Sequence, residues 1–142
     1  MTTTDIVFDE AKHIYTQQGE ALLNVTGILQ KAGLTDLSNV PPLILERACK
    51  FGRACHKMTQ LYDQDNLDET TLDPFLKSYL ESWKQAVKML DIVEWLSIEE
   101  LIFNPRYRYV GTLDRVGVNS KGIIVLIDIT SIFSINYCDR GF

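Results

Sequence analysis

Two aspartates lie inside runs of β-prone residues, and they constrain the fold more than any other feature of the sequence. Asp114 follows Gly-Thr-Leu within one run, and Asp128 is embedded in Ile-Val-Leu-Ile-Asp-Ile. An aspartate in a buried strand costs free energy unless it is paired, hydrogen-bonded or bound to a cation. The Asn-Ser-Lys-Gly sequence of residues 119–122 predicts a hairpin turn between the two runs. Because each aspartate is five or six residues from that turn, we expect the two carboxylates to lie near each other across the paired strands.

Two carboxylates that face one another repel, and a divalent cation removes that repulsion. Carboxylate oxygens are hard ligands that suit Mg²⁺ or Mn²⁺, ions that keep bound waters and meet substrate phosphates. Such a metal supplies hydroxide and stabilises the charge that grows on a phosphoryl group. In the alternative interpretation, one aspartate lies on the exposed face or caps a turn, because strand acids also form structural pairs. The pattern by itself leaves both interpretations open.

The order of the segments predicts an α/β fold of the α+β kind, in which a mixed central sheet with an antiparallel meander is flanked by helices. Turn-forming residues between apolar pairs predict a hairpin within residues 6–23. Residues 25–33 predict a short helix with Thr26 capping its start and Gly33 ending it. Apolar spacing predicts two longer helices, over 43–62 and 73–90, and three strands, over 99–103, 107–118 and 123–130.

The size and charge of the chain limit its organisation and its partners. With 142 residues, 46% of them apolar, the chain can close one hydrophobic core, so we expect a single domain over residues 1–142. Within it we expect the hairpin and short helix in 1–40, helices in 41–95, the strand meander in 96–130 and an atypical tail in 131–142. The net charge of -5 repels polyanions, so contact with nucleic acid requires a local basic patch.

Cysteine usage and hydropathy favour a cytoplasmic protein without a membrane partner. The three cysteines are odd in number and lack metal-ligand spacing, and the N-terminus has neither a basic nor an apolar leader region. The longest apolar run, residues 123–127, is far shorter than the roughly 20 residues that cross a bilayer. We therefore expect a reduced, cytoplasmic setting.

Four short motifs follow one another along the chain: Gly52-Arg-Ala-Cys-His56, Glu99, Gly111-Thr-Leu-Asp114-Arg-Val and Val125-Leu-Ile-Asp128-Ile-Thr130. In order and spacing they resemble the motifs of RecB-like and phage exonuclease-like PD-(D/E)XK nucleases. Residues 8–34, with His13-Ile-Tyr15 and Val25-Thr-Gly-Ile-Leu, also resemble the N-terminus of phage members, so the resemblance covers nearly everything from residue 6 to 130. It implies a restriction-endonuclease-like core and hydrolysis of DNA that depends on Mg²⁺ or Mn²⁺.

The resemblance also implies roles for particular residues. The principal metal ligands would be Asp114 and Asp128, with Glu99 as an additional catalytic acid, the carbonyl of Ile129 as a further ligand, and His56 approaching the same metal or ordering the site. Adjacent strand residues point to opposite faces, so only one of Glu99 and Glu100 can face the site. The spacing to Asp114 favours Glu99 without excluding Glu100. Apart from the resemblance, a lone helical histidine is more often bonded to a neighbour than a metal ligand.

The sequence departs from the family pattern at Thr130, which stands where the family has the lysine of its Asp-x-Lys motif. That lysine positions or activates the attacking water and steadies the scissile phosphate, and threonine has neither its charge nor its reach. The family continues into a helix with a Gln-x-x-x-Tyr motif, which residues 131–142 do not contain. We therefore expect the chain to be truncated or frame-altered from about residue 129. A shortened sheet exposes an edge, which predicts self-association or a partner protein there.

A basic stripe is expected on the 43–62 helix, where Lys50, Arg53 and Lys57 fall within an arc of about 60°. The stripe predicts contact with DNA phosphates, and the alternative is an ordinary solvated face. Since no feature of the sequence recognises particular bases, binding would be directed at the DNA backbone and sensitive to salt.

Two functions stay open. The first is a metal-dependent DNA nuclease of phage or prophage recombination or repair, acting as an exonuclease. The second is an inactive remnant, or a module that binds DNA or metal without catalysis.

Overall fold

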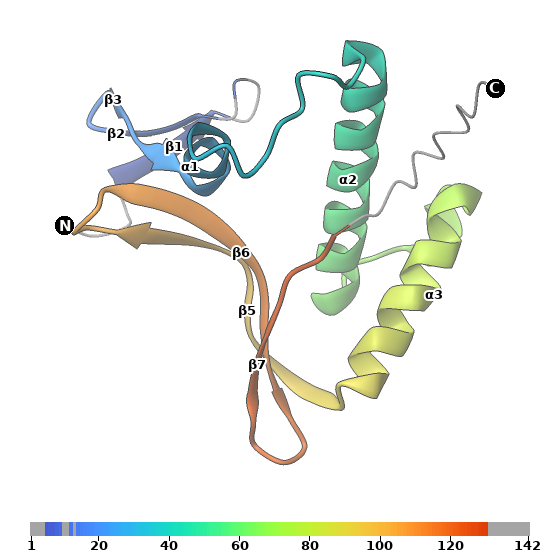
Figure 1. Ribbon diagram of the computed structural model, residues 1–142. Helices are drawn as coiled ribbons and strands as arrows, with labels where there is room; N and C mark the ends of the chain where they lie inside the picture. Colours follow the sequence, from blue (N-terminus) through green and yellow to red (C-terminus); the bar gives the residue numbers. More distant parts are fainter. Residues whose placement is uncertain (1–4, 10–11, 13, 131–142) are drawn as a thin grey trace. The chain divides into compact units, whose positions relative to one another are not determined.

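The chain separates into two compact units in the computed structural model, which describes residues 5–9, 12 and 14–130 (Figure 1). The first unit is formed by Met1–Val40 and Asp91–Asp128, and the second by Pro41–Leu90 and Ile129–Phe142. The described strands and one short helix belong to the first unit, and the two long helices belong to the second. The single-domain organisation stays a prediction, and the predicted tail over 131–142 lies outside the described residues.

A small antiparallel sheet opens the first unit, in the part of the chain where the sequence predicts a hairpin. Its strands are β1 (Ile6–Asp9), β2 (Ile14–Gln17) and β3 (Glu20–Ala21), in that order across the sheet. Gln18 and Gly19, with φ of 52° and 82°, form the tight turn between β2 and β3. Positive φ at a two-residue hairpin turn matches the right-handed twist of the flanking strands. The predicted hairpin is therefore confirmed, with one additional short strand.

The second sheet of this unit is mixed, as the order of segments predicts. Its strands are β4 (Leu23–Asn24), β5 (Ile92–Asn104), β6 (Tyr109–Asn119) and β7 (Ile124–Ile127). The long strand β6 pairs in parallel with β4 and antiparallel with both β5 and β7. Because β5 follows β6 along its whole length, β4 and β7 share the other edge of β6. The α+β class and the antiparallel meander are thus confirmed.

β5 begins seven residues before the predicted start at Glu99. Its pairing with β6 contains register shifts between Ile92 and Glu94 and between Trp95 and Ser97. A bulge places an extra residue in one strand and interrupts the alternation of inward and outward side chains. Since alternation is the sequence signal for a strand, the bulged half of β5 was not recognisable from the pattern.

The helix α1 (Val25–Lys31) is capped by Asn24, whose Oδ1 accepts a hydrogen bond of 2.5 Å from the Gly27 amide. The expectation that Thr26 caps this helix is therefore wrong, because Thr26 already lies within the first turn. Gly33 follows the helix with a φ of +71°, a conformation that glycine adopts without steric cost, so the predicted end is confirmed. Tyr15, Leu22 and Val110 form the buried core of the unit.

The second unit is built on two helices at the predicted positions, α2 (Pro42–Asp63) and α3 (Pro74–Met89), with the short 3₁₀ helix η2 (Glu69–Thr71) between them. Asp73 caps α3, and its Oδ1 accepts a hydrogen bond of 2.8 Å from the Phe75 amide. Buried Trp83 of α3 donates from Nε1 to Asp63 Oδ1 of α2 at 2.9 Å, which ties the two helices together. No helix in the described part of the chain is long and apolar enough to cross a membrane.

Candidate metal centre

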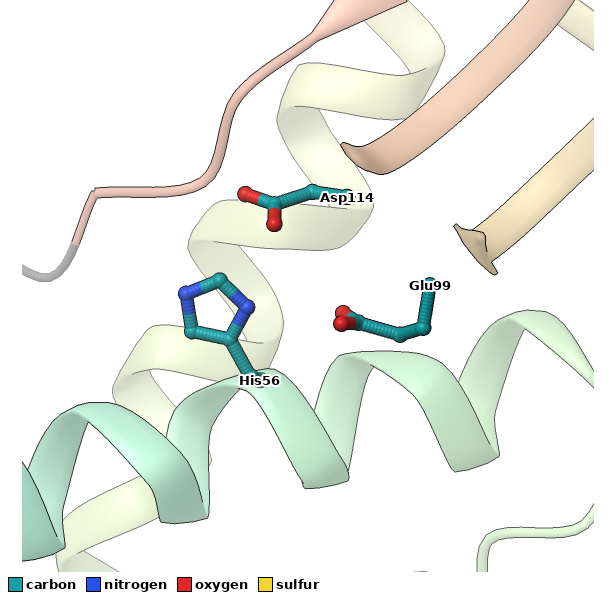
Figure 2. Close-up of side chains that lie close together, drawn as sticks. All are labelled: His56, Glu99 and Asp114. Carbon is teal, nitrogen blue, oxygen red and sulfur yellow. The ribbon is translucent and has the colours of Figure 1, made fainter. Parts of the chain in front are cut away.

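The centre of the candidate site is a pair of carboxylates on neighbouring strands, Glu99 on β5 and Asp114 on β6 (Figure 2). The ladder pairs Ile98↔Arg115 and Glu100↔Leu113 flank them, so the register sets Glu99 directly opposite Asp114. A carboxylate oxygen of Glu99 lies within 4.8 Å of one of Asp114. Asp114 is only 9% exposed. Two acidic side chains held this closely, one of them buried, repel each other unless a cation offsets the charge.

The backbone at Glu99 is unusual for a strand, with a φ of +52°. A left-handed conformation at a residue with a side chain costs roughly 1–2 kcal/mol, and such residues cluster at functional sites. Glu99 is partly buried, whereas Glu100 is exposed and accepts a short hydrogen bond from the Ser97 hydroxyl. Of the two adjacent glutamates, Glu99 is therefore the one placed beside Asp114.

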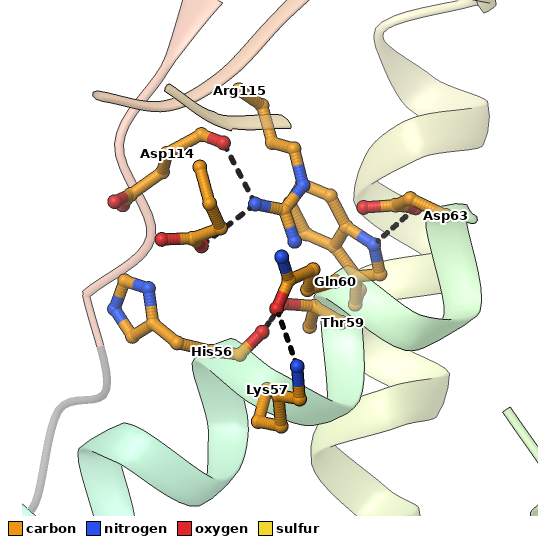
Figure 3. A network of polar contacts seen from close by, with 9 residues as sticks. His56, Lys57, Thr59, Gln60, Asp63, Asp114 and Arg115 are labelled. Carbon is orange, nitrogen blue, oxygen red and sulfur yellow. Dashed lines mark hydrogen bonds and ion pairs between the residues drawn. The ribbon is translucent and has the colours of Figure 1, made fainter. Parts of the chain in front are cut away.

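Arg115 is the residue of this site that the sequence interpretation missed. Its side chain is completely buried, and its Nη1 donates to Glu99 Oε1 at 2.8 Å. The same nitrogen donates to the Asp114 carbonyl oxygen at 2.7 Å (Figure 3). A buried guanidinium requires such partners, because an unpaired charge away from water is very costly. The available signal was an arginine directly after an aspartate in an otherwise apolar strand.

Asp128 lies one residue beyond the end of β7. The last ladder pair is Arg115↔Ile127, so the pairing of β6 with β7 ends one residue before Asp128, and the expected approach of Asp128 to Asp114 stays a prediction. Asp128 is exposed, unlike Asp114. Ile129 and Thr130 follow it outside any strand, the first half-buried and the second exposed. Their roles, and that of Asp128 as a ligand, stay predictions.

His56 lies on α2, in the second unit, and is half-buried. Its carbonyl oxygen accepts a hydrogen bond of 3.0 Å from Thr59 Oγ1, one turn further along the helix (Figure 3). Figure 2 draws its imidazole side chain, which carries the two nitrogens that can ligate a metal. A role as metal ligand stays the prediction that the Gly52–His56 motif makes.

The residues of the first unit fit a hard divalent cation. Glu99 and Asp114 offer carboxylate oxygens, which Mg²⁺ and Mn²⁺ prefer over nitrogen or sulfur. Arg115 offsets the charge of Glu99, and the carboxylate of Asp114 leaves the three side chains with a net negative charge. A divalent ion therefore matches the charge and the donor chemistry of this part of the chain.

The predicted basic stripe is exposed along α2. Lys50 pairs with Glu46 at 2.7 Å, and Lys57 Nζ donates to Gln60 Oε1 at 3.1 Å. The hydrogen bond and charge of Lys50 lower the pKa of Glu46 below its ordinary value. Glu46 lies one turn before Lys50 and neutralises the charge of Lys50. Arg53 and Lys57 therefore carry most of the remaining positive charge of the stripe.

No family model matches the chain, and neither a curated protein nor a solved structure matches it.

Proposed function

We propose that the chain is a nuclease-like protein with a PD-(D/E)XK core, whose site binds Mg²⁺ or Mn²⁺ and acts on the phosphodiester backbone of DNA. The observation that carries the proposal is the pair of Glu99 and Asp114 on adjacent strands, with carboxylate oxygens within 4.8 Å and Asp114 buried. Two carboxylates on adjacent strands, one of them buried, are costly for stability, and a cation offsets that cost. The reaction class, hydrolysis of DNA phosphodiesters, comes from the resemblance of the four motifs to those of PD-(D/E)XK nucleases.

In this proposal Asp114, Glu99 and Asp128 supply carboxylate oxygens, and the motif positions add the Ile129 carbonyl and His56. An ion held there would supply a water molecule of lowered pKa and would offset negative charge on the phosphoryl group. Asp114 and Glu99 would hold the ion in a fixed place, because one is buried in a strand and the other is tied to Arg115 at 2.8 Å. Fixed ligands are what in-line attack on a phosphodiester requires.

The α2 stripe would hold the DNA backbone, with Arg53 and Lys57 as the main phosphate contacts. We further propose an exonuclease role in phage or prophage recombination or repair, in the cytoplasm of a bacterium or an infected host. Fluorescence anisotropy with a labelled duplex tests the stripe. Replacing Arg53 and Lys57 by alanine should weaken binding and reduce the salt slope by about 0.9 per lost phosphate contact. Lys77→Ala, on α3, is the control. If its salt slope equals that of the Arg53/Lys57 variant, the basic stripe does not contact DNA.

A second function has its own support in Thr130, which stands at the position of the motif lysine and is exposed. Without a cation at this position, the transition state loses a stabilising charge that is worth several kcal/mol in comparable sites. The chain would then retain metal and DNA binding while lacking turnover. It would act as a binding module or an inactive remnant.

A nuclease assay on linear single- and double-stranded DNA with Mg²⁺ or Mn²⁺ separates the two functions. The variants are Asp114→Ala, Thr130→Lys and, as a control at an exposed acid, Asp65→Asn. Activity that is lost only in Asp114→Ala supports the enzyme. Activity that appears only in Thr130→Lys supports an inactive site on an intact scaffold. If no variant cleaves DNA and the wild type binds no Mn²⁺, the metal-site proposal is wrong.

A sheet edge is the proposed surface for self-association or a partner protein. In the described part of the chain β7 pairs only with β6, and Ile124 and Leu126 of β7 are 67% and 71% exposed. An unprotected apolar edge strand favours pairing with another chain. Light scattering after size-exclusion chromatography should give a higher mass for the wild type than for Ile124→Lys/Leu126→Lys. Equal monomer masses would exclude this surface.

A further inference from the structure

We infer that the turn between β5 and β6, residues 105–108, binds single-stranded DNA by stacking an unpaired base on Tyr107 and holding the neighbouring phosphates with Arg106 and Arg108. The inference rests on the proposed action on DNA and adds the form of DNA that is bound. It concerns only residues of the first unit and requires no metal ion.

The turn presents its side chains from a fixed backbone. The ladder pair Asn104↔Tyr109 closes the hairpin of β5 and β6, so residues 105–108 form its turn (Figure 1). Asn104 Oδ1 accepts hydrogen bonds of 3.0 Å from the amides of both Arg106 and Tyr107. An asparagine that bonds the amides of the residues after it stabilises a turn locally. A ligand would therefore meet these side chains on an ordered backbone.

Tyr107 places a large aromatic ring at the surface. The residue is 62% exposed, and the guanidinium carbon of Arg106 lies 5.2 Å from the centre of its ring. A guanidinium over the face of a ring adds a cation–π attraction and helps to hold the ring in place. Aromatic rings beside basic groups are the surfaces on which proteins stack the bases of single strands, whatever the base. Tyr107 and Arg106 together have the composition of such a surface.

Two cations flank the ring. Among the residues that the structure describes, the Arg106 guanidinium forms no ion pair. Arg108 Nη2 lies 3.7 Å from Glu20 Oε2, and both side chains are exposed, so this pair is weak and can open for a phosphate. Arg108 also has a φ of +52°, a conformation that glycine adopts without steric cost. An arginine at this position costs stability and supplies a second cation to the turn.

The combination of a ring and two cations favours single-stranded DNA over other anionic partners. A nucleotide joins a flat base to a phosphate, so one unpaired nucleotide can engage the ring and a guanidinium together. In a duplex the bases are stacked on one another, and a base must leave that stack before a protein ring can contact its face. An acidic peptide would pair with the arginines alone and leave the ring without a role.

The experiment measures binding by fluorescence anisotropy of a labelled thymidine oligonucleotide, in a chelator so that the metal site takes no part. A labelled blunt duplex of the same length is titrated separately. The variants are Tyr107→Ala, Tyr107→Phe, which keeps the ring, and Arg106→Met, which removes one charge. Lys121→Met removes one charge at an exposed position in the turn between β6 and β7 of the same unit and is the control.

Tyr107→Ala should weaken binding of the single strand by about tenfold, the loss of one stacked base, and change binding of the duplex by less than about twofold. Tyr107→Phe should bind like the wild type. The salt slope of Tyr107→Ala should stay unchanged, because no phosphate contact is lost. Arg106→Met should reduce that slope by about 0.7, the value for one phosphate of a single strand.

Wild-type affinity of Tyr107→Ala, equal losses on the two forms of DNA, or equal salt slopes in Arg106→Met and Lys121→Met would each overturn the inference. So would displacement of the oligonucleotide by polyglutamate as efficient as that by the unlabelled oligonucleotide, because the turn would then bind acidic chains in general. These results leave the proposed metal site standing. Failure of the wild type to bind either form of DNA overturns the inference together with the proposed action on DNA.

Discussion

Arg115 and Glu99 form a partly buried ion pair between two neighbouring strands, with Nη1 and Oε1 separated by 2.8 Å. The arginine side chain is 0% exposed and the glutamate side chain 22% exposed. The pair links the acid on β5 to the strand that carries Asp114. It therefore joins the stability of the sheet to the arrangement of the candidate metal ligands.

Glu99→Gln should destabilise the protein when no metal is present. The substitution leaves the Arg115 charge buried without its carboxylate, and breaking a buried pair from one side costs about 3 kcal/mol when the lost partner is slightly exposed. Urea unfolding in the presence of a chelator measures the free energy of unfolding. Glu100→Gln, at the adjacent exposed position, is the control and should change it by less than about 0.5 kcal/mol. Equal losses in the two variants would show that the ion pair contributes no stability.

Gly111→Ala should destabilise the first unit. A Cβ at this position would meet Val25 Cγ2 at 2.8 Å, and a β-branched side chain cannot easily move aside. Overpacking of this kind costs about 1–3 kcal/mol. Val25→Ala removes the obstructing methyl, so the double variant should recover at least half of the loss in thermal unfolding. Strict additivity of the two changes would contradict the contact.

Asp73→Ala should weaken the start of α3. The Asp73 carboxylate accepts the Phe75 amide at 2.8 Å, and loss of such a cap costs about 1 kcal/mol. Chemical denaturation of the full chain gives the change in unfolding free energy. Lys77→Ala, on the exposed part of the same helix, should stay within about 0.5 kcal/mol of the wild type. If Asp73→Ala is as stable as this control, the Phe75 amide bonds to water in place of the Asp73 carboxylate without a loss of stability.

Cys55 should react with iodoacetamide much more slowly than Cys49 in the folded protein. Cys55 is buried and Cys49 is exposed. Burial raises the pKa of the Cys55 thiol because the thiolate is poorly solvated, and the thiolate is the reactive form. Peptide mass mapping over time at pH 8 compares the two sites. Equal labelling rates without denaturant would contradict the burial of Cys55.

The same shift predicts how Cys55 affects stability at high pH. Its folded pKa lies above its unfolded value, so the folded state holds the proton more tightly. The contribution of the Cys55 thiol to the free energy of unfolding is therefore complete below its unfolded pKa. That contribution is lost as the pH rises through the folded pKa of the same thiol. Cys55→Ala should reduce the alkaline loss of melting temperature, which a series of thermal melts at rising pH measures.

Local signals predicted most of the element boundaries. Asp73-Pro74 marks the start of α3, Gly33 the end of α1, and residues 119–122 the turn between β6 and β7. Each depends on neighbours within a few positions, which is why a single sequence contains the information. The start of β5 was missed because bulges near Glu94 and Trp95 interrupt the alternation that identifies a strand.

The sequence by itself determined the helices, the hairpin turns and the position of Asp114 within a strand, because these follow from short-range chemistry. Only the tertiary structure decided that Glu99, and not Glu100, lies beside Asp114, and that Arg115 is buried against both strands. Glu99 and Arg115 are sixteen positions apart in the sequence, and no local signal marks their pairing. It arises from the register of β5 on β6 and from the left-handed backbone at Glu99, both of which depend on how the whole sheet packs.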